Sequence, residues 1–212
     1  MPPITELVIG AFRPEVAKEG LALMRSSVPK YFHPLPGILL QRVGHMVEHN
    51  GEDISGEYRS LLFIEWETPE DFHNFYPKSK AFGEFVATVG EYLGGKPTPR
   101  LFQPVPEHSR SNATLQHGVT QIFTGRVVGG KQDETSGAWK KLVEAVKEEE
   151  KGDLKEWSGW GIEDADGVWT GLLGWESVET HEAVTAKKGV VEAIRALKEQ
   201  GDFEDFVVTF QE

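Results

Sequence analysis

The side chains of this sequence best suited to acid–base chemistry are its histidines. The chain of 212 residues has seven His and no Cys, which excludes thiolate catalysis, disulfides and Cys-based metal sites. It has no Gly-x-Ser-x-Gly nucleophile elbow, and the glycines at 129–130 lack the spacing of a phosphate-binding loop. A single imidazole acting near neutral pH, where its ordinary pKa already lies, is the chemistry that remains.

Three histidines, His45, His73 and His181, are candidates for such a general base. His45 and His49 fall on one face of a predicted strand, where four residues span about 13 Å, too far for both to bind one metal ion. His73 and His181 each fall in the first turn of a predicted helix, and no predicted helix carries a His-x-x-x-His pair, so we expect no metal site. The alternative is structural: His45 as a partly buried polar residue, the other two as surface residues.

Aromatic residues in the second half of the chain predict a ligand pocket there. Trp160 and Trp175 fall on two predicted strands and have glycine neighbours, which leave space beside the rings. Space beside aromatic rings is typical of a pocket for a planar apolar ligand, and His181 would lie near its rim. The alternative is that the glycines accommodate the Trp rings themselves within a filled core.

A rival pocket is predicted in the first half, around His45, His73 and Tyr76, where a phenol beside an imidazole suits enolate chemistry. Arg126 lies among apolar neighbours on a predicted strand. It could hold a ligand carboxylate or enolate, or it could pair with Glu176 in a structural role.

The sequence contains two copies of one unit. The segment FIEWETPE at 63–70 resembles LLGWESVE at 172–179, with Trp, Glu, a hydroxyl residue and Glu recurring 109 positions apart. The stretches 5–10 and 120–125 also match in their Thr, their Gly and their apolar pattern. A Pro- and Ser-rich stretch separates the copies. We therefore predict repeats at 1–104 and 117–212, joined by a linker at 105–116.

Periodicity predicts the order β-α-β-β-α-β in each copy. The third strand, 60–67 in the first copy, is apolar on both faces. Each sheet therefore needs helices on one face and the other copy on its second face. The predicted fold is α+β: two ferredoxin-like repeats packed sheet to sheet as an intramolecular α+β barrel. Glu67 and Glu176, which directly precede predicted helix caps, are interpreted as structural.

Two such units, each with a Trp-Glu-Ser/Thr step at 66–68 or 175–177, resemble the tandem form of the dimeric α+β barrel superfamily. Within it they resemble antibiotic-biosynthesis-monooxygenase-like and stress-responsive barrel proteins. The resemblance implies a cofactor-independent oxygenase, cyclase or isomerase acting on an aromatic or polyketide-like substrate. Its alternatives are a non-catalytic stress-associated or ligand-binding barrel and a haem-binding barrel with one axial His. Many monooxygenase-like members carry a His on the helix that holds His73 or His181 here, although these two are not at equivalent positions.

Composition excludes several kinds of partner. There are 22 basic and 34 acidic residues, and the net charge of −12 argues against a nucleic-acid or anionic-membrane surface. No apolar run reaches the ~18 residues of a membrane span, and the first residues do not resemble a signal peptide. We expect a cytoplasmic protein that binds a small apolar or aromatic molecule. We expect it to be a monomer with an internal pseudo-dimer, or a homodimer.

We predict that the purified protein is colourless and metal-free, because it has no Cys and no close pair of His. An absorption spectrum and elemental analysis of native material measure this. A Soret band or a stoichiometric metal would contradict the prediction.

Overall fold

Both halves of the chain contribute antiparallel strands to one sheet. The computed structural model describes residues 2–150 and 152–210. The strands of the first repeat are β1 (Ile4–Gly10), β2 (Ile38–His49), β3 (Glu52–Asp53), β4 (Ser60–Trp66) and β5 (Arg100–Pro104). Those of the second repeat are β6 (Val119–Val127), β7 (Lys155–Ile162), β8 (Val168–Trp175) and β9 (Gly201–Thr209).

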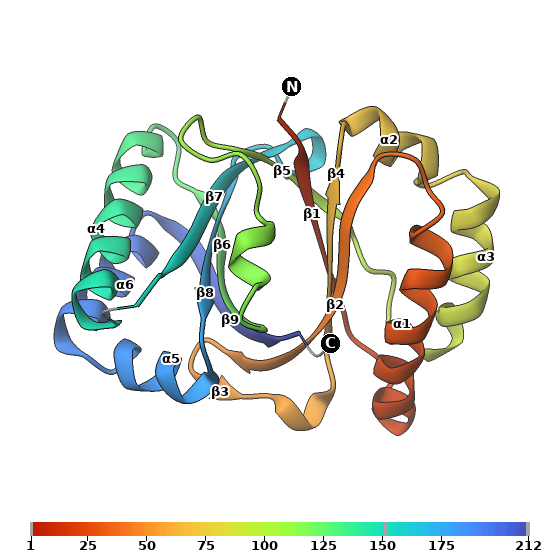
Figure 1. Cartoon of the computed structure of the whole chain (residues 1–212), viewed down its shortest axis with the longest axis horizontal. Coiled ribbons are helices and arrows are strands. Elements are labelled where there is room, and N and C mark those ends of the chain that lie inside the picture. Colours follow the sequence, from red (N-terminus) through yellow and green to blue (C-terminus); the bar gives the residue numbers. More distant parts are fainter. Residues whose placement is uncertain (1, 151, 211–212) are drawn as a thin grey trace.

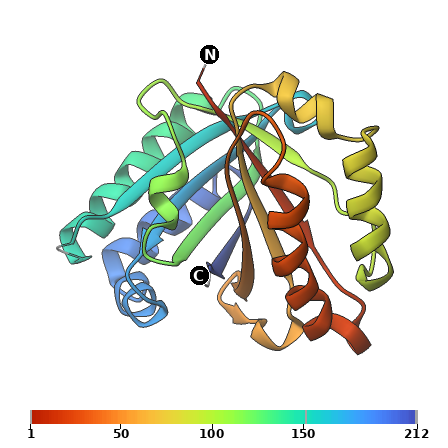
Figure 2. The ribbon, with the colours of Figure 1, turned by 45° about the vertical axis from the view of Figure 1, so that its right-hand side comes forward.

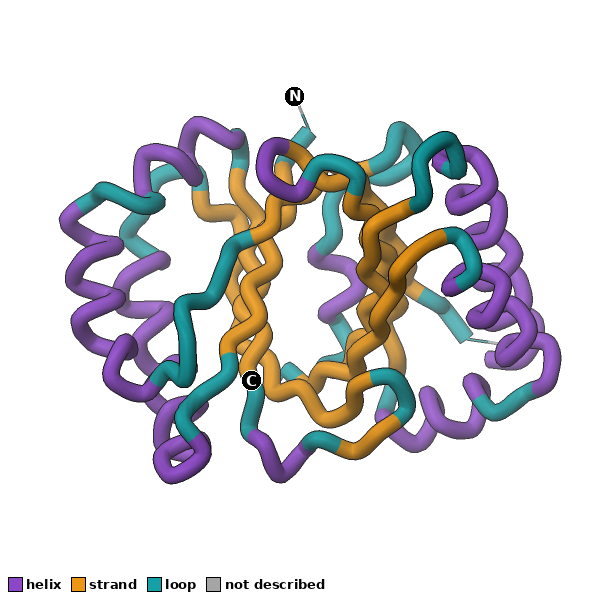
Figure 3. The backbone as a smooth tube through the Cα atoms, turned by 180° about the vertical axis from the view of Figure 1, so that it is seen from behind, coloured by secondary structure: helices purple, strands orange, loops and turns teal. Residues whose placement is uncertain are grey.

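The strands close into a barrel. The order is β2-β4-β1-β5 in the first repeat and β7-β8-β6-β9 in the second, which is the ferredoxin-like order in both. Hydrogen bonds between β5 and β7, and between β2 and β9, join the two sheets along both edges. Figures 1 and 3 show the resulting ring of strands from its two sides. The predicted intramolecular α+β barrel is confirmed.

Helices cover the outside of the ring. On the first repeat lie α1 (Ala17–Phe32), α2 (Pro69–Phe75) and α3 (Lys80–Val89), and on the second lie α4 (Gln132–Glu150), α5 (Val178–Thr185) and α6 (Lys188–Lys198) (Figure 2). Thr68 and Ser177 cap α2 and α5 by accepting hydrogen bonds from the backbone N–H three residues on. Within the described ranges, none of the helices combines the length and the apolar character needed to cross a bilayer.

Strand β4 is buried along its whole length, as its doubly apolar sequence predicts. Leu62, Ile64 and Trp66 pack against the helices of the first repeat. Leu61 and Phe63 point into the barrel and join a core built from both repeats, which includes Met46, Trp157, Leu172 and Phe206. Burial of apolar area from both sheets in this one core holds the repeats together.

The segment between the repeats is held against one end of the barrel by a buried carboxylate. The short 3-10 turn at Asn112–Leu115, green in Figure 1, packs against β6, β7 and β8. Glu65 Oε2 accepts two hydrogen bonds from Arg110, at 3.0 and 2.7 Å. Its Oε1 accepts from Ser111 N, Ser111 Oγ and Asn112 N, at 2.7, 2.8 and 2.9 Å. Composition alone predicts a simple linker here, yet Ser111 and Thr114 are fully buried.

We predict that Glu65→Gln lowers the free energy of unfolding by about 2–4 kcal/mol. It leaves the Arg110 guanidinium without its charged partner and puts an amide NH₂ among donors. Chemical denaturation followed by Trp fluorescence measures the change. Glu67→Gln, an exposed neighbour, is the matched control and should stay within about 0.5 kcal/mol of the unaltered protein. Equal stabilities of the two variants would contradict the clamp.

Candidate functional site

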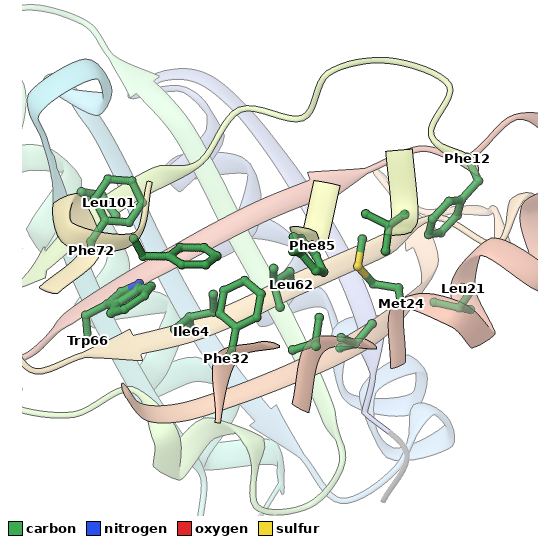
Figure 4. Close-up of a cluster of buried hydrophobic side chains, with 14 of the residues drawn as sticks. Phe12, Leu21, Met24, Phe32, Leu62, Ile64, Trp66, Phe72, Phe85 and Leu101 are labelled. Atoms are coloured by element: carbon green, nitrogen blue, oxygen red, sulfur yellow. The ribbon is translucent and has the colours of Figure 1, made fainter. Parts of the chain in front are cut away.

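An apolar cavity of about 400 Å³ lies in the first repeat, between the sheet and the helices α1 and α3. Its floor consists of side chains from β1 and β4, including Val8 and Leu62, and its walls carry aromatic rings from the helices. Figure 4 shows part of this layer, with Leu62 of β4 lying between Phe32 of α1 and Phe85 of α3. A concave, mostly apolar space with few polar groups is typical of a small-molecule site.

Small residues on the floor and rigid rings in the walls keep this space open. Gly10 and Ser60 lie opposite each other on β1 and β4, and a Cβ at Gly10 would be only 2.7 Å from Ser60 Oγ. In the wall, the Phe32 and Phe85 rings meet edge to face with centroids 5.1 Å apart. Aromatic rings packed against one another in this way do not collapse into the space between helices and floor.

Glu6 is the one carboxylic acid that lines the cavity among the described residues. It lies on β1, is 5% exposed, and its Oε2 accepts a hydrogen bond of 2.7 Å from Trp66 Nε1. Burial raises the pKa of Glu6 to about 7, and the hydrogen bond from Trp66 opposes part of that rise. Near neutral pH this carboxyl can therefore both accept and release a proton.

The local sequence explains how Glu6 reaches the cavity. Alternation along β1 puts Glu6 on the same face as Ile4 and Val8, which pack against the helix layer. Trp66, the Trp of the repeated Trp-Glu-Thr step, ends β4 on that same face. Sequence reasoning missed Glu6. The signal in the sequence was Glu6 itself, one acidic residue between the apolar residues Ile4 and Val8 on the same face of a strand.

The mouth of the cavity carries two further polar groups. Tyr76 lines it and packs edge to face on Phe82, with ring centroids 5.0 Å apart. Lys96, in the loop before β5, is exposed and is the only cationic side chain that lines the cavity within the described residues. Tyr76 is thus the one predicted site residue that the structure places at this cavity.

The structure does not bring His45 and His73 to Tyr76 at this cavity. His73 is half exposed, and its Nε2 lies 2.8 Å from Glu163 Oε1, on the outside of the barrel. His45 Nε2 lies 2.9 Å from the Ser55 carbonyl oxygen, and its ring stacks on Tyr58. His73 and Tyr76 do share a separate cavity of about 210 Å³, which His45 does not line, so a pocket around all three residues is not formed.

The apolar pocket predicted beside Trp160 and Trp175 is also wrong, because that core is filled. Trp175 is fully buried, whereas Trp160 is half-buried and packs against the same core. The space at Gly171 and Gly159 is taken by Trp rings, and the space at Gly161 and Gly174 by the backbone of Ala165 and Thr114. A Cβ at Gly171 would lie 2.4 Å from Trp169, and one at Gly159 would lie 2.5 Å from Trp157. The structure thus supports the alternative of a filled core, in which two of the four glycines accommodate Trp rings and the other two accommodate backbone.

His181 is buried beneath α5 and not at a rim. It is 2% exposed, and its ring meets Trp175 edge to face with centroids 5.3 Å apart. Burial lowers its pKa to about 4, against a smaller opposing effect of Asp205, so the imidazole is neutral near pH 7. The expected match between its pKa and neutral pH is therefore wrong. His181 lines a separate, polar cavity of about 250 Å³.

Arg126 has a structural partner, and it is not Glu176. Its Nη1 donates a hydrogen bond of 2.9 Å to the Asp166 carbonyl oxygen in the turn before β8, and its side chain is exposed. The antiparallel register explains the difference from the expectation: Arg126 pairs with Val168, whereas Trp175, which precedes Glu176, pairs with Val119 at the other end of β6. The expected ion pair with Glu176 is not formed.

Neither the first-repeat cavity nor the cavity at His181 fits a metal ion or a haem. Among the described residues, no three His, Asp or Glu side chains gather closely enough to hold a metal ion. The first-repeat cavity has no His in its lining. The cavity at His181 is smaller and carries the charged residues Glu48, Lys198 and Asp205, unlike the broad apolar slot that a haem macrocycle occupies.

Comparison with known proteins identifies the architecture. No protein-family model and no curated protein matches the sequence. Solved structures do match along nearly the whole chain. An anthrone oxidase-like protein shares 15% identity at a TM-score of 0.72, with 100% of this chain and 92% of that chain covered. The chain has the tandem dimeric α+β barrel fold.

Two further structures agree on this fold. A "putative monooxygenase" from Lactobacillus acidophilus shares 15% identity at a TM-score of 0.62, covering 99% of this chain and 94% of its own. A mutant chlorite dismutase from Candidatus Nitrospira defluvii shares 11% identity at a TM-score of 0.56, with 99% and 92% covered. At such identities the tandem barrel fold is what the likeness shows, and chemistry has to be argued from the residues.

We predict that Glu6 makes stability depend on pH. Its pKa is about 7 in the folded chain against an ordinary value of 4.5, so its contribution is complete below about pH 4.5 and is lost as pH rises through about 7. Glu6→Gln is neutral at every pH and should exceed the unaltered protein by up to about 3 kcal/mol at pH 8. The difference should shrink toward pH 4.

Denaturant unfolding of both proteins between pH 4 and 8 measures this difference. Glu67→Gln, whose carboxyl is exposed, serves as the control and should follow the unaltered protein across the range. Parallel curves for Glu6→Gln and the unaltered protein would show that Glu6 titrates normally.

Proposed function

We propose that the first-repeat cavity binds a flat, largely apolar aromatic molecule and that Glu6 removes a proton from it. The observation that carries the proposal is one carboxyl, with a pKa of about 7, at the base of an otherwise apolar cavity. A general base works best when its pKa lies near the operating pH. Strongly shifted pKa values in a cavity are also typical of functional sites.

The walls of the cavity favour a planar substrate. Phe75, Phe82 and Phe85 offer rings for stacking and edge contacts, and Val8 and Leu62 offer a flat aliphatic floor. A ring system held between these surfaces would present a C–H bond to Glu6. Its oxygen substituents would lie toward Tyr76 and Lys96 at the mouth. Because His45, His73 and His181 do not line this cavity, the proposal gives none of them the role of base.

We infer oxygenation without a cofactor as the reaction. The structures named "putative monooxygenase" and "anthrone oxidase-like" support this class. Glu6 takes a proton from an activated CH₂ group, and the resulting carbanion is delocalised over the rings. Dioxygen accepts its electrons and forms a C–O bond, giving a hydroperoxide of the substrate. Loss of water leaves a ketone, so CH₂ and O₂ become C=O and H₂O.

We predict that Glu6→Gln lowers the oxidation rate of 1,8-dihydroxyanthrone at least about 100-fold, because the amide cannot accept the proton. Oxygen uptake and the absorbance of the quinone product measure the rate. For the unaltered protein the rate should rise with pH through about 7, as the carboxyl loses its proton. An unchanged rate in Glu6→Gln would contradict the proposed role of Glu6.

Two comparisons sharpen this experiment. Glu91→Gln, an exposed residue that does not line the cavity, should retain the full rate. Trp66→Phe removes the hydrogen bond that holds down the pKa of Glu6, so the pH at half-maximal rate should increase.

Exchange of the substrate CH₂ protons for deuterium without oxygen would show that proton abstraction is separate from oxygenation. Exchange without any oxygen uptake in air would point to an isomerase or cyclase instead.

A further inference from the structure

The second repeat has its own cavity, of about 250 Å³, at a corresponding place. It is an open cavity between β6, β9 and the helices α5 and α6. The first repeat borders it with Glu48 near the end of β2 and with the turn at Asn50 and Gly51. Its lining includes Gln121 and Asp205 from the strands, His181 from α5, Val191 and Ile194 from α6, and Glu48 from β2.

Strand register shows that Gln121 occupies the position of Glu6. Glu6 pairs with Ile64, two residues before Trp66, and Gln121 pairs with Leu173, two residues before Trp175. In the first repeat the carboxylate of Glu6 accepts a hydrogen bond from the indole N–H of Trp66. In the second repeat the Trp175 N–H has no hydrogen-bond partner among the described residues.

Buried polar atoms without partners, donors as well as acceptors, lie at the base of this second cavity. Gln121 is 2% exposed, and its Nε2 lies 3.3 Å from Asp205 Oδ2, to which it donates. Its Oε1 has no partner within the described part of the chain, and the same holds for both ring nitrogens of His181. The low pKa of His181 keeps that ring neutral, so one of its nitrogens is an acceptor without a partner and the other is an N–H donor without a partner. Buried polar groups without partners are rare in folded proteins and require an explanation.

Charge at the cavity is negative. Asp205 is paired with Lys198, whose Nζ also donates to Asn50 Oδ1 at 3.1 Å. Glu48 is half-buried and forms no ion pair with any residue that the structure describes. Burial, together with Asp205, Glu182 and Asp53, raises its pKa, whereas Lys198 has the opposite, smaller effect. A positive charge beside Glu48 would offset this excess of negative charge.

We propose that this cavity binds an organic monocation, a primary ammonium or a guanidinium on a short apolar body. Its N–H groups match the acceptors present: the Glu48 carboxylate, Gln121 Oε1 and one nitrogen of His181. The apolar body would lie on Val191, which is 50% exposed, and on Ile194. The site is separate from the first-repeat cavity and does not depend on the function proposed there.

Titration calorimetry of the full chain with n-butylammonium and n-butylguanidinium tests this proposal. Neutral n-butanol and anionic butyrate are probes of matched size. We predict saturable binding of the two cations, at least tenfold tighter than that of butanol, and no binding of butyrate, because hydrogen bonds to charged groups are the stronger ones. The ring signals of His181 in NMR spectra should shift on addition of the cations.

Variants assign the binding to this cavity. Glu48→Gln should weaken cation binding about tenfold or more, whereas Glu182→Gln, exposed and outside the lining, should change it less than about threefold. Val191→Trp, at an exposed position, should block the cavity while the chain stays folded. Equal affinities for n-butylammonium and n-butanol, an unshifted His181 signal, or unchanged binding in Val191→Trp would each overturn the proposal. Absence of binding at about 10 mM would mean that water alone satisfies these atoms.

Discussion

Hydrogen bonding between the two sheets, at β5–β7 and β2–β9, is the constraint on which the rest of the structure depends. Because both edges of each sheet are paired with the other repeat, each sheet has one face turned into the ring and one turned to its helices. Large side chains such as Trp157 and Phe63 fill much of the inside. The main apolar space therefore lies in the layer between sheet and helices, which is where the first-repeat cavity is found.

Two buried glutamates illustrate how surroundings divide one residue type into two roles. Glu65 points into the barrel and receives five hydrogen bonds, including two from a guanidinium. So many donors fix the position of this side chain, which acts as a structural clamp. Glu6 lies on the opposite face of the same sheet and receives one hydrogen bond, from an indole. With one donor in an apolar cavity, its charged and neutral forms are balanced near pH 7, as proton transfer requires.

The sequence predicted the fold well because repeat and periodicity are local signals. The Trp-Glu-Ser/Thr repeat predicts two similar units, Thr68 and Ser177 predict where two helices begin, and the doubly apolar β4 predicts packing on both of its faces. The structure confirms all three. The cavity could not be located in this way, because an empty space is the difference between the volume enclosed and the volume filled. Glycines beside Trp residues are compatible with either outcome, and only ring orientation decides that Trp169 and Trp139 occupy the space at Gly171. The linker was similarly ambiguous, because the burial of Ser111 depends on a partner, Glu65, distant in sequence.

Fusion of the two repeats into one chain removes a restriction that a symmetric dimer would impose. In a twofold dimer of identical chains, any residue placed in one cavity also appears in the other. Here the position next to the buried Trp holds Glu6 in one repeat and Gln121 in the other. An ionisable carboxyl beneath an apolar space favours proton transfer from an aromatic compound. An amide beside a neutral imidazole and an unpaired Glu48 favours a hydrogen-bonding cation instead. One scaffold can therefore maintain two chemically different cavities, and the closed barrel holds them in fixed relation because both sheets share its core.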